Sequence, residues 1–190
     1  MIRQAGIQDA EQVIPLLHSA IGSIACSLAG TMDEPEALHI LKEFYKQPGN
    51  RISYENVIVD ERDGRIAGML VAYHGSEAES LDQPFLERIR RVKGIANYTI
   101  EKESRVEDYY LDAVAVHEDY QGKGIAKMLM KAFEAKAEAL GYPTVGLIVE
   151  EHNERAHAIY VKQGYRTEGE LTVYGHRYLR MTKPTGGGSR

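Results

Sequence analysis

A strand, a short turn and a glycine-bearing helix start follow one another between residues 108 and 126, and this order strongly constrains the fold. Residues 108–116 form a nearly continuous apolar run, which is typical of a strand buried on both faces. Residues 121–126 then open an amphipathic helix that is predicted to reach residue 140. Glycines let backbone N–H groups approach a ligand closely, and the first turn of a helix attracts anions. The segment therefore predicts a phosphate-binding loop at the end of a central strand.

The loop matches neither of two common phosphate-binding patterns. A P-loop requires a Ser or Thr after its Gly-Lys pair, and neither residue type follows here. A dinucleotide fingerprint requires a third glycine, whereas Lys127 stands at that position. Taken alone, residues 121–126 are equally compatible with an ordinary glycine-rich helix start.

The remaining patterns predict one mixed α/β domain over residues 1–183. Strands are expected at residues 1–3, 56–60, 65–73, 144–149, 165–173 and 177–182. Helices are expected at residues 9–21, 33–45, 81–92 and 153–163. Asp63-Gly64 between two apolar runs predicts a tight hairpin. Residues 184–190 are interpreted as a flexible tail or a remnant of cloning.

Charge and composition exclude several classes of function. The formal net charge is −5, and the chain lacks the basic surface that nucleic-acid binding requires. It has no apolar run long enough to cross a membrane. The single cysteine, Cys26, suits a reducing compartment, so the cytoplasm is the expected location. His152 and His157 lack the partners that a metal site needs, so no metal is expected.

A second segment, residues 153–165, reads Asn-x-x-Ala-x-x-x-Tyr-x-x-x-Gly-Tyr and follows the next predicted strand. Together the two segments resemble the GCN5-related N-acetyltransferase (GNAT) family. Residues 121–126 match its [QR]-x-x-G-x-[GA] loop, and residues 153–165 match its N-x-x-A-x-x-x-Y-x-x-x-G-[FY] helix and strand. The resemblance extends over about residues 1–182. It implies a central, mostly antiparallel mixed sheet flanked by helices, with splayed central strands forming the acyl-CoA site.

The resemblance also implies roles for individual residues, with acetyl-CoA as the cosubstrate. Asn153 would hydrogen-bond the pantetheine arm, and Tyr160 would protonate or stabilise the departing thiolate. A backbone amide of the central strand would polarise the thioester carbonyl. The strand residues that would pair with the pantetheine arm are Val114, Ala115 and Val116. The loop residues whose backbone amides would hold the pyrophosphate are Gln121, Gly122, Lys123, Gly124, Ile125 and Ala126.

The general base is expected on the central strand, because an ammonium must lose a proton before it can attack. The strand pattern places residues 108, 110, 112, 114 and 116 on one face. Asp112 is the first candidate, since a carboxylate inside an apolar strand needs a partner or a purpose. Asp108 and Glu107 follow it. An equally good interpretation makes Asp112 a hydrogen-bonding brace for the neighbouring loop.

These features predict a transferase that moves the acetyl group of acetyl-CoA to a primary amine by direct attack in a ternary complex. The acidic balance favours a small cationic amine as acceptor. A protein N-terminus or lysine is the alternative acceptor, and a non-catalytic acyl-CoA-binding regulatory module is an alternative of another class. A homodimer is left open. Residues 76–105 are long for a connection, which suggests that they cover a site.

Overall fold

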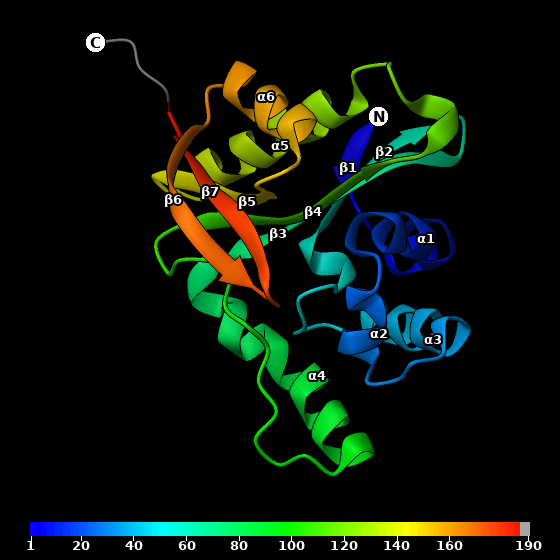
Figure 1. Ribbon diagram of the computed structural model, residues 1–190. Coiled ribbons are helices and arrows are strands. Elements are labelled where there is room, and N and C mark those ends of the chain that lie inside the picture. The colour runs from blue at the N-terminus through cyan, green and yellow to red at the C-terminus, as the bar shows by residue number, and fades with distance from the viewer. Residues whose placement is uncertain (187–190) are drawn as a thin grey trace.

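In residues 1–186, which the computed structural model describes, seven strands form one sheet in the order β1-β2-β3-β4-β5-β7-β6 (Figure 1). Every neighbouring pair is antiparallel except β4 and β5, which run parallel. The predicted mixed, mostly antiparallel sheet is confirmed. The strands are β1 (Ile2–Gln4), β2 (Val57–Arg62), β3 (Arg65–His74), β4 (Tyr109–Val116), β5 (Thr144–Glu150), β6 (Arg166–Val173) and β7 (His176–Pro184).

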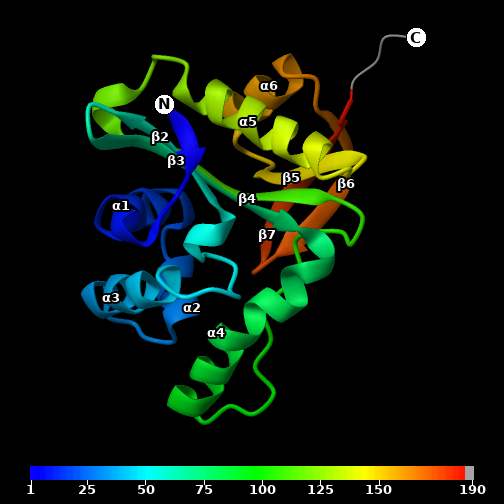
Figure 2. The same ribbon diagram turned by 180° about the vertical axis from the view of Figure 1, so that it is seen from behind.

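The helices cover both faces of this sheet (Figures 1 and 2). One face carries α1 and α3 together with residues from α4, and the other carries α5 and α6. After α4 the chain returns along that helix to reach β4 (Figure 2). The helices are α1 (Ala10–Ile21), α2 (Ile24–Ala29), α3 (Glu34–Tyr45), α4 (Ala78–Lys93), α5 (Ile125–Ala139) and α6 (Glu154–Lys162).

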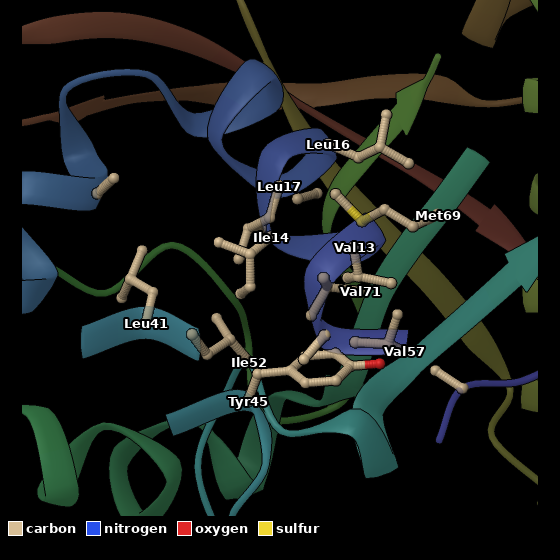
Figure 3. Packing of buried hydrophobic residues seen from close by; sticks show 14 of the residues in the cluster. Val13, Ile14, Leu16, Leu17, Leu41, Tyr45, Ile52, Val57, Met69 and Val71 are labelled. Carbon is tan, nitrogen blue, oxygen red and sulfur yellow. The ribbon is translucent and has the colours of Figure 1, made fainter. Parts of the chain in front are cut away.

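The larger core forms where α1 packs on the sheet and α3 packs against α1 (Figure 3). The buried positions of α1 recur at the three-to-four-residue spacing that a helix requires to present one apolar face. Tyr45 at the end of α3 is fully buried, and its hydroxyl donates to the Gly6 carbonyl at 3.0 Å. The labelled side chains that meet here are Val13, Ile14, Leu16, Leu17, Leu41, Tyr45, Ile52, Val57, Met69 and Val71.

Three helices differ from the sequence prediction, and α4 begins at Ala78 instead of residue 81. The short helix α2 was not predicted, because six residues are too few to display a helical period. The helix expected from residue 121 begins instead at Ile125. Gly122 and Gly124 adopt φ values of +74° and +76°, which keep residues 121–124 as a loop.

A β-bulge at Asp112 overturns the predicted alternation of β4. Val71 of β3 pairs with Ala113 and the next residue pairs with Leu111, so Asp112 has no opposite residue. The extra residue shifts the alternation by one. Tyr109 and Leu111 consequently share the α5 face with Val114 and Val116, while residue 110 packs elsewhere.

The parallel strands β4 and β5 stay together only at their beginnings. They pair at Tyr109 with Val145 and at Tyr110 with Gly146, and no later register follows in the described residues. The rest of β4 therefore presents backbone groups toward β5 without a strand partner there. This divergence opens the centre of the sheet.

The described chain extends slightly past the predicted domain end. Strand β7 reaches Pro184, and the Thr185 N–H donates to the Pro143 carbonyl at 2.9 Å. The predicted tail, residues 184–190, therefore begins in a strand, and its last four residues lie outside the described part of the chain. No helix within residues 1–186 is long and apolar enough to cross a membrane.

Candidate active site

A cavity of about 350 Å³ lies where β4 and β5 diverge. Asp112 and Val114 of β4 line it, together with Asn153 and Tyr160 of the second motif. The structure thus brings four of the predicted site residues to one cavity. Its far wall is apolar and comes from α1 and α2, with Leu17, Ala20, Ile21, Ile24 and Leu28.

Tyr160 reaches the cavity from α6. Its ring packs edge-on against Tyr165, with 5.9 Å between the ring centroids. Burial raises the pKa of the Tyr160 hydroxyl above its usual value of 10.0. The phenol therefore keeps its proton at neutral pH and is able to donate it to an anion in the cavity.

Asn153 caps the N-terminus of α6. Its Oδ1 accepts a hydrogen bond from the Ala156 N–H at 3.1 Å, which is the usual N-cap geometry. With Oδ1 engaged in this way, the Nδ2 amide is the group suited to donate to a ligand.

The glycine loop lies beyond the C-terminal end of β4, after a short 3-10 helix (Glu118–Tyr120). A Cβ atom added at Gly122 or Gly124 would meet no heavy atom of the described chain within 4 Å, so the space above both glycines is open. Gly124 is the N-cap of α5 and offers no side chain to its first-turn amides. These amides are accordingly available to an anion.

Lys123 of this loop points back toward the preceding turn. Its Nζ donates to the Asp119 carbonyl at 2.9 Å and lies 4.9 Å from the centre of the Tyr120 ring. Residues 121–126 do not line the cavity that holds Tyr160. The predicted site is therefore split into a loop at one end of β4 and a cavity along its side.

Asp112 forms a buried ion pair with Arg51. Asp112 Oδ1 accepts from Arg51 Nη2 at 2.9 Å, and Oδ2 accepts from Nε at 3.1 Å. Side-chain exposure is 11% for Asp112 and 7% for Arg51. Arg51 Nη1 also lies 3.4 Å from Asp82 of α4. The guanidinium thus joins the bulge in β4 to the helix that precedes residues 94–108.

Sequence reasoning missed Arg51 and Glu103, which both line the cavity. Glu103 lies in the connection between α4 and β4, and its carboxylate accepts from the Tyr110 hydroxyl at 2.9 Å. Burial raises the pKa of the Glu103 carboxyl above its ordinary 4.5, although Arg51 opposes this shift. The unusual length of that connection was the available signal for Glu103, whereas Arg51 had none.

The other candidate bases occupy different surroundings. Asp108 forms a buried ion pair with Arg180 of β7, and burial raises the pKa of its carboxyl. The Glu107 side chain is 58% exposed and lies 4.0 Å from Arg105. Neither carboxylate lines the cavity that contains Tyr160. Residues 1–186 contain no group of three or more His, Cys, Asp and Glu side chains placed to hold a metal ion.

Solved structures share this fold over nearly the whole chain. A crystal structure described as an acetyltransferase is 28% identical, covers 97% of this chain and 99% of its own, and superposes with a TM-score of 0.81. An N-acetyltransferase from Staphylococcus aureus Mu50 is 21% identical, covers 96% of this chain and 100% of its own, and has a TM-score of 0.79. The second likeness shows the fold alone.

Sequence comparisons match the same family over shorter segments. Acetyltransferase SG1711 of Sodalis glossinidius is 35% identical over 71 residues, which are 37% of this chain and 48% of that protein. The chain spans about half the length of the curated relatives it matches. The acetyltransferase (GNAT) family model matches residues 25–165 and so covers both motifs and the strand β5 between them. The chain therefore belongs to the acetyltransferase (GNAT) family.

Proposed function

We propose that the protein transfers the acetyl group of acetyl-CoA to a primary amine by direct attack within a ternary complex. One observation carries this proposal. Tyr160 and Asn153 line the same cavity as Val114, beside the edge of β4 that diverges from β5. A proton donor, an amide and a strand edge with available backbone groups are what a thioester on a pantetheine arm requires.

The donor half of the site is proposed to extend along β4. The backbone of Val114, Ala115 and Val116 would pair with the pantetheine arm, and one of its amides would polarise the thioester carbonyl. Asn153 would donate to the arm from the opposite side. The amides of residues 121–126 would hold the pyrophosphate, which the open space above Gly122 and Gly124 supports.

Tyr160 is proposed as the general acid. The attack forms a bond from nitrogen to the carbonyl carbon and breaks the bond from that carbon to sulfur. The phenol would give its proton to the departing sulfur, and its raised pKa supports this role because the proton is present at neutral pH.

Asp112 has two proposed roles, and its ion pair with Arg51 supports the brace over the base. A carboxylate held at both oxygens by a guanidinium is a poor proton acceptor, because protonation would cost the charge-assisted hydrogen bonds. An Asp112→Asn variant separates the roles. If Asp112 is the base, the variant should lose the acid limb of the pH–rate profile. If Asp112 is a brace, the variant should keep that limb and have a lower free energy of unfolding.

The acceptor is proposed to be a small cationic amine. The carboxylates of Glu103, Asp112 and Glu150 face the cavity together with the single guanidinium of Arg51. This excess of negative charge attracts an ammonium group. A cytoplasmic location fits both acetyl-CoA and the single cysteine.

The test is a thiol-release assay with acetyl-CoA and a panel of polyamines, amino acids, aminoglycosides and short peptides. We expect one class of small amine to stimulate thiol release. Stimulation by peptides alone would favour a protein acceptor instead. Calorimetric binding of acetyl-CoA without stimulation by any amine would favour a non-catalytic binding module.

A further inference from the structure

Glu103 stands where two cavities meet. The first is the cavity that contains Tyr160, and the second, of about 330 Å³, lies between α4 and residues 99–106. Arg51 and Glu103 line both. A molecule that enters the reaction cavity can therefore contact Glu103, although only 14% of its side chain is exposed to solvent.

The two oxygens of Glu103 have different surroundings. Oε2 accepts from the Tyr110 hydroxyl at 2.9 Å, which fixes the orientation of the carboxylate. Oε1 lies 3.9 Å from Arg51 Nη2, beyond hydrogen-bond distance. Arg51 donates instead to both oxygens of Asp112. Among the carboxylates around Arg51, Glu103 is therefore held in place by a neutral hydroxyl while its second oxygen remains suited to a new cationic partner.

We propose that Glu103 binds the ammonium group of the acceptor and takes its proton, a role that rests on the proposed acetyl transfer. The ammonium gives one proton to Glu103 Oε1, and the nitrogen lone pair then attacks the thioester carbon. The carbon–sulfur bond breaks, and the Tyr160 hydroxyl protonates the sulfur. The second proton of the nitrogen returns to the Tyr160 oxygen, and Glu103 releases its proton to solvent.

The charged and titratable groups around Glu103 favour this exchange. Burial raises the pKa of the Glu103 carboxyl, which makes it a stronger proton acceptor than an exposed glutamate. Asp112 and Asp82 reinforce the shift of this pKa, whereas Arg51 and the hydrogen bond from Tyr110 oppose it. An arriving ammonium meets a net negative site. The groups that face Glu103 from the surrounding elements are Arg51, Asp82, Asp112 and the hydroxyls of Tyr73, Tyr110, Tyr174 and Tyr178.

Neither of the neighbouring aspartates suits the role as well. Both oxygens of Asp112 are occupied by Arg51. Asp82 faces the second cavity and does not line the one that holds Tyr160. Among the three carboxylates around Arg51, Glu103 is the one that lines the reaction cavity with an oxygen beyond hydrogen-bond distance of the guanidinium.

The experiment compares Glu103→Gln and Glu103→Asp with Glu87→Gln, which removes one negative charge from the exposed face of α4. The acceptor is spermidine, or the panel amine that gives the fastest thiol release with the wild-type protein. We measure kcat and KM for the amine across pH, and the acetyl-CoA Kd by calorimetry. Circular dichroism melts show whether each variant folds.

We expect Glu103→Gln to lower kcat/KM for the amine by about 10²- to 10⁴-fold, the range typical of a lost acid–base group. The KM for the amine rises, the acetyl-CoA Kd stays unchanged, and the acid limb of the profile disappears. Glu103→Asp recovers part of the activity, and Glu87→Gln matches the wild type. A folded Glu103→Gln variant with wild-type kcat/KM and an intact acid limb would overturn the role of Glu103 and leave acetyl transfer standing. Wild-type protein that binds acetyl-CoA and acetylates no amine would overturn the proposed function itself.

Discussion

Both carboxylate oxygens of Asp112 accept hydrogen bonds from the guanidinium of Arg51, with donor–acceptor distances of 2.9 and 3.1 Å. The β-bulge leaves Asp112 without a cross-strand partner, and its carboxylate meets an arginine 61 residues earlier in the chain. The pair joins the central strand to the segment before β2. It therefore fixes the wall of the cavity from two distant parts of the sequence.

Replacing Arg51 with methionine should destabilise the protein by about 3–5 kcal/mol, the usual cost of breaking a buried ion pair from one side. The methionine fills much of the volume but leaves Asp112 uncompensated in the interior. Urea unfolding at neutral pH measures the loss. Arg177→Met is the matched control, because Arg177 pairs with Glu170 at the surface and is itself 58% exposed. Equal stability for both variants would show that the Arg51 pair contributes no more than a surface contact.

Gly124→Glu should abolish acetyl-CoA binding. The new side chain would fill the open space above the loop and put a negative charge where the pyrophosphate is proposed to sit. Gly141→Glu is the control, because Gly141 follows α5 at its other end with φ +79° and equally open surroundings. Both variants place a glutamate at a nearly identical positive φ, so the backbone strain is similar. A difference in acetyl-CoA binding measured by calorimetry therefore reports the effect of the new side chain on the ligand. Loss of binding in both would assign the effect to strain.

Tyr160→Phe should lower kcat by about 10²-fold and leave the acetyl-CoA Kd unchanged, because it removes a proton donor and little volume. The raised pKa of the Tyr160 hydroxyl adds a pH signature. A general acid acts while protonated, so the wild-type rate should persist to higher pH than an ordinary phenol allows. At still higher pH the wild-type rate should fall as the Tyr160 hydroxyl loses its proton, and the variant should not show this alkaline fall. Steady-state kinetics from neutral to alkaline pH measure both effects, and an unchanged profile would remove Tyr160 from the proton transfer.

Much of the fold follows from local patterns in the sequence. Asp33 caps α3 through the Glu36 N–H at 2.8 Å, and Asp63-Gly64 forms the expected tight hairpin with φ values of 50° and 76°. Each of these features depends on residues only a few positions apart. The glycine loop is an exception, because the sequence pattern predicts a helix from residue 121, whereas positive φ values at Gly122 and Gly124 delay its start to Ile125.

The acceptor side of the cavity could not be predicted in the same way. The bulge at Asp112 depends on how β4 pairs with β3, a choice made between strands far apart in sequence. Arg51 carries no local signal, because its partners come from α4, β4 and residue 103. Only tertiary contacts bring these charges together. The residues next to Arg51 in the sequence do not distinguish it from an arginine in an exposed loop.

Glu103→Gln should stabilise the protein at neutral and alkaline pH while lowering its activity. The folded state raises the pKa of Glu103 above its ordinary 4.5 because burial disfavours the charged carboxylate. Between those two pKa values the folded protein binds more protons than the unfolded chain, so this residue's contribution to stability falls as pH rises. As pH falls below this ordinary pKa of 4.5, the carboxyl becomes neutral in both states and the cost of burying its charge disappears.

Urea unfolding of both proteins across this pH range measures the effect. The stability advantage of Glu103→Gln should be smallest at acid pH, grow as pH rises through the folded pKa and then level off. Glutamine still accepts the hydrogen bond from Tyr110, so the comparison isolates the buried charge. An advantage that did not change with pH would mean that the carboxylate is as well solvated in the folded protein as in the unfolded chain. Glu103 would then lack the raised proton affinity on which its proposed role depends. A buried carboxylate that is poorly solvated gains more from an incoming ammonium than a well-solvated one does.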